Sequence, residues 1–255
     1  MKTIFLFVKN LFFIFFILFL CSSCSEEELL TIQQAQNYVI AHRGSYQLHG
    51  LPENSRASLQ EALSFQILGT EFDVRQTKDG ELVICHDETF NGKEIAKSDF
   101  KELLAFTLSN GETIPTLKDF FSVFKEMHSS KILYAEMKYC DVNKVVDLVN
   151  EFNIQDNVTY ISFNKSYCDR IVNLGLGAYV FYLSGDLSPQ EALEEGYGGI
   201  SYHESVFNAH PEWLIEAKEL GLKVCVWPIN DLEKMKYYTN KDILISTDVP
   251  TLYGN

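Results

Sequence analysis

The chain has 255 residues, of which 46% are hydrophobic, so it is long enough to bury a large core in one or two domains. Its 35 acidic residues outnumber its 21 basic residues and give a formal net charge of −14 at pH 7. Such a surface repels nucleic acid and anionic lipid at long range. This excludes a nucleic-acid partner and requires that any anionic ligand be attracted by local charge.

The first 23 residues have the pattern of an export signal. Lys2 and Lys9 provide a positive start, and residues 11–20 (LFFIFFILFL) form an uninterrupted apolar run. Ten residues are too few to span a bilayer, but they suit the apolar segment of a secretory signal peptide. We therefore predict a signal peptide over residues 1–23. Its removal would leave 19 basic and 35 acidic residues, a net charge of −16.

Residues 24–37 are expected to form a lipidated N-terminus and linker. Cys24 follows two serines and resembles the lipid-modified cysteine of a bacterial lipoprotein, although Cys21 stands where an aliphatic residue is usual. The acidic stretch 25–28 (SEEE) is similar to tags that send some Gram-negative lipoproteins to the cell surface. We expect an exported protein, anchored by lipid in the bacterial outer membrane and without a transmembrane helix. Cell-surface exposure is left open, and an ordinary cleaved signal peptide is the alternative.

Strand-like and helical patterns alternate from residue 38 onward. The strand-like runs are 38–43, 70–74, 132–138, 158–163, 178–183, 199–203, 223–229 and 243–248. Apolar residues at helical spacing lie in 54–67, 116–129, 141–152 and 210–221, with Asn54 expected as the cap of the first helix. Eight strands, mostly followed by helices, predict one (β/α)8 TIM barrel over residues 38–255.

Residues 81–87 (ELVICHD) follow the second strand too closely to be a ninth parallel strand. The link 77–80 (TKDG) is a tight turn, whereas parallel neighbours need a long crossover. We expect residues 70–77 and 81–87 to form an antiparallel hairpin above the barrel mouth. A two-residue turn would set Asp73 directly across from His86. A three-residue turn with a glycine bulge would shift this pairing by one.

Ionisable residues stand at the ends of several predicted strands, where the active sites of such barrels lie. Residues two apart on a strand share a face, so Glu71 accompanies Asp73 and Glu136 accompanies Lys138. Five strand ends or loops thus offer one cavity seven side chains: His42, Arg43, Glu71, Asp73, His86, Glu136 and Lys138. Such a set is costly to desolvate without a function or a bound ion. Trp227 and His203 are further candidates for the mouth, with core packing and simple exposure as their respective alternatives.

An ordered set of motifs resembles the glycerophosphodiester phosphodiesterase family. The motifs are AHRG (41–44), PENS (52–55), EFDVRQTKDGELVICHD (71–87), AEMK (135–138), VWPIND (226–231) and ISTDVP (245–250), and the resemblance spans roughly residues 38–252. It implies a barrel of the phospholipase C-like phosphodiesterase type. It further implies that His42 and His86 are the acid/base pair, and that one divalent cation, Mg²⁺ or Ca²⁺, is held by Glu71, Asp73 and Glu136.

The same resemblance implies that Arg43 and Lys138 contact the substrate phosphate and that Glu53 supports the site. Asn54 and Ser55 are sufficiently explained as helix-cap residues. The chemistry agrees, because three carboxylates form a hard oxygen site and two histidines can divide the acid and base roles near neutral pH. We therefore predict metal-dependent hydrolysis of glycerophosphodiesters to an alcohol and glycerol phosphate.

Other interpretations remain open. One is a phospholipase C- or D-like enzyme acting on lipids, and another is a non-catalytic surface lipoprotein that binds a glycerophospho group. A zinc amidohydrolase usually carries His-x-His on its first strand, where this chain has His42-Arg43-Gly44. The alcohol released, the choice of metal, the assignment of acid and base, a cyclic intermediate and the oligomeric state are all left undecided. Four cysteines (85, 140, 168 and 225) are expected to be buried thiols.

Overall fold

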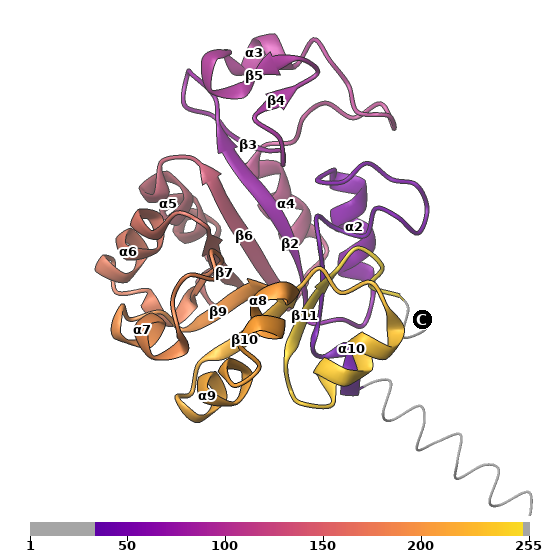
Figure 1. Cartoon of the computed structure of the whole chain (residues 1–255). Helices are drawn as coiled ribbons and strands as arrows, with labels where there is room; N and C mark the ends of the chain where they lie inside the picture. The colour runs from indigo at the N-terminus through magenta and orange to yellow at the C-terminus, as the bar shows by residue number, and fades with distance from the viewer. Residues whose placement is uncertain (1–33, 252–255) are drawn as a thin grey trace, which may run out of the picture.

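The eight strand-like runs of the sequence form a closed parallel barrel in the computed structural model, which describes residues 34–251 (Figure 1). The barrel strands are β1 (Val39–Ala41), β2 (Gly69–Gln76), β6 (Ile132–Tyr139), β7 (Val158–Ser162), β8 (Val180–Tyr182), β9 (Gly199–His203), β10 (Lys223–Trp227) and β11 (Leu244–Thr247). Strand β1 pairs in parallel with both β2 and β11, which closes the sheet. The predicted (β/α)8 barrel is confirmed.

Helices surround the barrel, and all of those named here except α9 begin at a side-chain cap. They are α2 (Arg56–Ser64), α4 (Leu117–Glu126), α5 (Val142–Phe152), α6 (Lys165–Asn173), α7 (Pro189–Glu194), α8 (Glu204–Ala209), α9 (Trp213–Glu219) and α10 (Leu232–Thr239). Thr116 caps α4 and Asp141 caps α5 through their side-chain oxygens. The cap of α2 is Ser55, which accepts from the Ser58 N–H. The expectation that Asn54 caps this helix is therefore wrong.

Side chains alternate along the strands, so one apolar core lies between the barrel and the helices and another lies inside the barrel. On β2, Phe72 and Val74 belong to the main hydrophobic core, which also contains buried residues of the helices. Their neighbours Glu71 and Asp73 therefore face the inside of the barrel. A smaller apolar cluster is formed by Ile40, Tyr134, Ile161, Phe181, Leu183 and Cys225. Most of its members also line the cavity described below, so the cavity has an apolar floor.

The hairpin after β2 forms as expected, but in the alternative register. Strand β3 (Leu82–Ile84) pairs antiparallel with β2, and the Thr77 N–H donates to the Glu81 carbonyl at 2.9 Å. Three residues remain in the turn, and its last residue, Gly80, has φ +93°. The extra residue shifts the register, so Asp73 meets Cys85, whose N–H donates to the Asp73 carbonyl at 3.0 Å. The direct pairing of Asp73 with His86 is therefore wrong.

A small lobe extends from this hairpin beyond the barrel mouth (Figure 1). It contains β4 (Thr89–Phe90), β5 (Lys93–Glu94), the 3₁₀ helix η1 (Ile95–Lys97) and α3 (Phe100–Leu103). It has its own apolar cluster of Val83, Phe90, Ile95, Leu103 and Ile114. This separate packing gives the segment after His86 a fixed structure next to the barrel mouth. Two further 3₁₀ helices, η2 (Gln155–Asn157) and η3 (Gly177–Tyr179), precede β7 and β8.

Within residues 34–251, no helix is both long enough and apolar enough to cross a bilayer. The predicted signal peptide, Cys24 and most of the predicted linker lie outside the described residues, so these predictions stay untested. Cys140, Cys168 and Cys225 are buried free thiols, as expected, whereas Cys85 is a free thiol that is only partly buried.

Candidate active site

A cavity of about 440 Å³ opens at the carboxyl ends of the barrel strands. Six of the seven ionisable residues predicted to share one cavity line it: His42, Arg43, Glu71, His86, Glu136 and Lys138. The seventh, Asp73, lies just behind this lining, with Oδ1 3.4 Å from Lys138 Nζ. His86 reaches the cavity although it does not face Asp73, because β3 ends at Ile84 and the chain then leaves the strand direction. The structure therefore brings the predicted set together.

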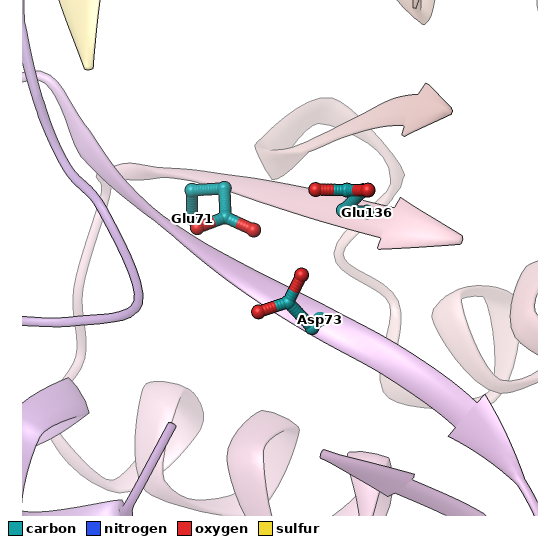
Figure 2. A group of neighbouring side chains, drawn as sticks. All are labelled: Glu71, Asp73 and Glu136. Atoms are coloured by element: carbon teal, nitrogen blue, oxygen red, sulfur yellow. The ribbon is translucent and has the colours of Figure 1, made fainter. Parts of the chain in front are cut away.

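Three carboxylates converge at the centre of this site (Figure 2). Glu71 and Asp73 project from β2, and Glu136 projects from the neighbouring strand β6, where it is the register partner of Asp73. Each offers one oxygen within 4.8 Å of the other two. All three residues are buried, at 3%, 1% and 7% exposure. We call Glu71, Asp73 and Glu136 the acidic triad.

Crowding of negative charge perturbs the acidic triad. Burial, followed by the charges of Asp73 and Glu136, raises the pKa of Glu71 well above its usual value. Burial and the charge of Asp73 likewise raise the pKa of Glu136 to about 7. Lys138 Nζ lies 2.7 Å from Glu136 Oε1 and offsets part of this repulsion. In the absence of further positive charge, the triad therefore resists full ionisation.

The acidic triad fits a divalent cation. Glu71 Oε1 is buried without a hydrogen-bond partner in the described part of the chain, and the buried Asp73 Oδ1 and Glu136 Oε1 share the Lys138 ammonium, at 3.4 and 2.7 Å. Together with Glu53, the three carboxylates face two cationic side chains, Arg43 and Lys138. One divalent ion would supply the two missing positive charges. Hard carboxylate oxygens are the ligands that Mg²⁺ and Ca²⁺ prefer.

Arg43 is held in place by carboxylates around it. Its guanidinium donates from Nη1 to both oxygens of Glu53, at 3.1 and 3.0 Å, and its Nε lies 3.6 Å from Asp73 Oδ2. Its backbone N–H donates to Glu71 Oε2 at 2.9 Å. Arg43 has a left-handed backbone (φ +54°) and is followed by Gly44, which is also left-handed (φ +82°). A Cβ on Gly44 would lie 2.5 Å from Ser58 Oγ, which explains the glycine of the AHRG motif.

The two histidines present their Nδ1 atoms to aspartates. His42 Nδ1 lies 2.7 Å from Asp248 Oδ1, and His86 Nδ1 lies 2.9 Å from Asp87 Oδ1. His42 Nε2 lies on the side of the acidic triad, 3.9 Å from Glu71 Oε2. The backbone of His86 is fixed by Arg75, which donates from Nε and Nη2 to the His86 carbonyl at 3.1 and 2.8 Å.

The side of the cavity formed by the later strands is aromatic. The Trp227 indole donates to the Ser201 carbonyl at 2.8 Å and packs edge-on against Phe163 and His203, at centroid distances of 5.7 and 5.2 Å. All three aromatic residues line the cavity. Trp227 and His203 therefore do line the mouth. His49, His128 and His210 are exposed, and none of them lines this cavity.

Three residues of the site were missed by sequence reasoning. Asn54 is buried, donates to Asp73 Oδ2 at 2.8 Å and accepts from the Asp73 N–H at 3.2 Å, so it orients a triad member and does not cap a helix. Asp248 and Arg75 contact the two histidines. All three lie inside the quoted motifs, but a motif does not show which distant residue a side chain will meet.

Comparison with known proteins agrees with this geometry. The sequence matches the model of the glycerophosphoryl diester phosphodiesterase family over residues 42–244. A glycerophosphodiester phosphodiesterase of Caldanaerobacter subterraneus subsp. tengcongensis is 31% identical over 246 residues, covering 84% of this chain and 95% of that protein. The chain belongs to the glycerophosphoryl diester phosphodiesterase family.

Solved structures of phosphodiesterases share the fold. A glycerophosphodiester phosphodiesterase from Parabacteroides distasonis superposes with a TM-score of 0.81 at 34% identity, covering 86% of this chain and 95% of that chain. A phosphodiesterase from Oleispira antarctica, solved in complex with the product sn-glycerol-3-phosphate, has a TM-score of 0.71 at 26% identity, covering 83% and 93%. The chain is therefore an enzyme, a phosphoric diester hydrolase, and the zinc amidohydrolase and non-catalytic interpretations are wrong.

Proposed function

We propose that this enzyme hydrolyses soluble glycerophosphodiesters to an alcohol and glycerol phosphate, with a divalent cation and with His42 and His86 as the acid/base pair. One observation carries the proposal. Around a single cavity, the site combines three buried carboxylates, which have too few hydrogen-bond donors for their oxygens, with two cationic side chains and two imidazoles. The product complex of the Oleispira antarctica phosphodiesterase supports glycerol phosphate as the product.

The acidic triad would hold one Mg²⁺ or Ca²⁺ ion. When bound there, such an ion supplies Lewis acidity to a phosphate oxygen and a fixed point for orienting the diester. Asn54 keeps Asp73 turned towards the ligand position through two hydrogen bonds, and the Arg43 N–H does the same for Glu71. These contacts correspond to the outer-shell hydrogen bonds that orient ligands in metal sites.

Arg43 and Lys138 would bind the non-bridging oxygens of the phosphate. Both line the cavity beside the triad, and each contacts two carboxylates, so their charges alone do not make the site positive. A divalent cation on the acidic triad would offset the excess negative charge, and the ion, Arg43 and Lys138 together would attract an anionic diester to a protein whose overall charge is strongly negative. Glu53 holds the Arg43 guanidinium in the orientation that faces the site.

His42 and His86 would move the protons. One imidazole removes the proton from the attacking hydroxyl as its oxygen bonds to phosphorus. The other gives a proton to the leaving alcohol oxygen as the second P–O bond breaks. Because each histidine engages an aspartate through Nδ1, the Nε2 atoms are available for these transfers. The attacking hydroxyl is either water, which gives glycerol phosphate directly, or the hydroxyl on the neighbouring glycerol carbon. In the second case a cyclic phosphate forms as the alcohol leaves, and water then opens the ring to give glycerol phosphate.

A substrate panel tests the proposal. Purified protein is incubated with glycerophosphocholine, glycerophosphoethanolamine, glycerophosphoglycerol and phosphatidylcholine vesicles, and the products are identified by mass spectrometry. We expect glycerol phosphate and free alcohol from the soluble diesters, loss of turnover with EDTA, and recovery with Mg²⁺ or Ca²⁺. Glu71→Gln should be inactive, and Glu126→Gln, an exposed site at the end of α4, is the matched control. Turnover that resists EDTA, or release of phosphocholine from the vesicles as the main product, would contradict the proposal.

A further inference from the structure

We propose that Asp248 is a positioning residue for catalysis: it fixes the His42 imidazole so that Nδ1 carries the proton and Nε2 faces the substrate. This inference rests on the proposed acid/base role of His42. It goes further by stating which nitrogen reacts and which residues determine that choice.

His42 is attached to the end of β11 through both its backbone and its side chain. Its backbone N–H donates to the Thr247 carbonyl at 2.9 Å, and its Nδ1 lies 2.7 Å from Asp248 Oδ1. Thr247 thus holds the backbone of His42, and the following residue, Asp248, holds its ring. The short Nδ1–Oδ1 distance is typical of a charge-assisted hydrogen bond.

The chemistry of Asp248 decides the tautomer. Burial works against its charge, but hydrogen bonds from His42 and Asn230 outweigh burial and lower the pKa of Asp248 to about 2. An ionised carboxylate only accepts hydrogen bonds, so the His42 Nδ1 must donate. In neutral His42 the Nε2 is then the unprotonated nitrogen, and it lies on the side of the acidic triad.

Asn230 in turn fixes Asp248. Its Oδ1 accepts from the Asp248 N–H at 2.9 Å and from the Thr247 hydroxyl at 3.0 Å. These two donors determine which end of the amide is oxygen, so Nδ2 must point to Asp248 Oδ2, which it meets at 2.6 Å. Both Asp248 oxygens are therefore engaged, and the carboxylate cannot rotate without breaking a hydrogen bond.

His86 has a weaker arrangement. Its partner Asp87 is the adjacent residue, and the Asp87 side chain is 76% exposed, whereas the Asp248 side chain is 15% exposed. Water competes for Asp87, and a hydrogen bond to a solvated carboxylate holds a ring less firmly. The two histidines are therefore held unequally, and only His42 has a ring fixed by a partly buried and doubly bonded carboxylate.

Asp248→Asn tests the inference with little change in shape. The new amide can still accept from Asn230, but its NH₂ would face His42 and favour the tautomer that is protonated on Nε2. With Mg²⁺ or Ca²⁺ present and glycerophosphoethanolamine and glycerophosphoglycerol as probes, we expect kcat to fall by about 10²–10⁴-fold. The KM and the calorimetric cation affinity should change less than about threefold, since neither the phosphate contacts nor the acidic triad is altered. Asp242→Asn, at the opposite end of the barrel, is the control.

Two further measurements keep the test decisive. In ¹⁵N-histidine spectra of the wild-type protein, with His42 assigned through His42→Ala, we expect protonation at Nδ1. In the His42→Ala background, Asp248→Asn should cause no additional loss of kcat. A wild-type His42 protonated at Nε2 alone overturns the inference, as does a kcat loss below tenfold or an equal loss in cation affinity. If His42→Ala retains its kcat, the proposed function fails too. If His42→Ala is inactive and Asp248→Asn is not, only the present inference fails.

Discussion

Raising the pH should destabilise the cation-free protein, and a divalent cation should remove that effect. The cause is Glu136, whose pKa is raised to about 7 in the folded protein, above a usual value of 4.5, by burial and by Asp73. Below about pH 4.5 the carboxyl is protonated in both states. Above that pH it ionises in the unfolded chain first, so stability falls as the pH rises and levels off once the pH has passed about 7.

The size of this loss follows from the shift. A pKa difference of about 2.5 units corresponds to about 3 kcal/mol of unfolding free energy at 1.36 kcal/mol per unit. For a domain of this size, about 3 kcal/mol lowers the Tm by roughly 6–12 °C. The pKa of Glu71 is raised in the same direction, so its ionisation adds to the loss. A cation bound to the ionised acidic triad opposes the loss of stability from both carboxylates, because it binds the folded state alone.

Thermal unfolding followed by circular dichroism measures the effect. The Tm is recorded between about pH 5 and pH 8, with EDTA and with excess Mg²⁺ or Ca²⁺. We expect the cation-induced rise in Tm to be small near pH 5 and to grow towards pH 8. In Glu136→Gln, which cannot ionise at this position, the EDTA curve should lose much of its pH dependence. A cation-induced shift that is independent of pH, or an unchanged pH dependence in Glu136→Gln, would refute the reasoning.

Four further outcomes are expected. Glu71→Ala should abolish both calorimetric Mg²⁺ or Ca²⁺ binding and turnover, and unchanged affinity would reject Glu71 as a ligand. His42→Ala and His86→Ala should each lower kcat by about 10²–10⁴-fold with cation affinity retained; a folded variant with near-normal kcat would remove that histidine from the mechanism. Asn54→Ala should weaken cation binding by about 10–100-fold, because Asp73 loses a hydrogen bond to its carboxylate and the acceptor of its backbone N–H, and calorimetry with an unaltered affinity would speak against this role. Cys24→Ser should release the protein from the membrane or leave it unprocessed, and mass spectrometry that finds an unacylated mature N-terminus downstream of Cys24 in the wild type would show an ordinary secreted enzyme.

The sequence by itself determined the barrel and most of its site. Regular alternation of strand and helix patterns has few compact solutions, and the parallel barrel is one of them. Because side chains alternate along a strand, the spacing of Glu71 from Asp73 and of Glu136 from Lys138 sufficed to place each pair on one face. The motifs then indicated the family, which the family model and the relatives confirm. The export signal and the lipid on Cys24 remain predictions.

Only the tertiary structure decided the contacts between distant residues. The hairpin register depended on one left-handed residue, Gly80, and a one-residue difference changed the partner of Asp73 from His86 to Cys85. Asparagine is a common helix-cap residue. Asn54 instead has a left-handed backbone (φ +56°), and its side chain donates to Asp73, 19 residues away in sequence. The pairing of His42 with Asp248 spans 206 residues and exists because barrel closure sets β1 beside β11. The local sequence pattern indicates which face of a strand a residue occupies. The closure of the barrel determines which distant residue lies beside it.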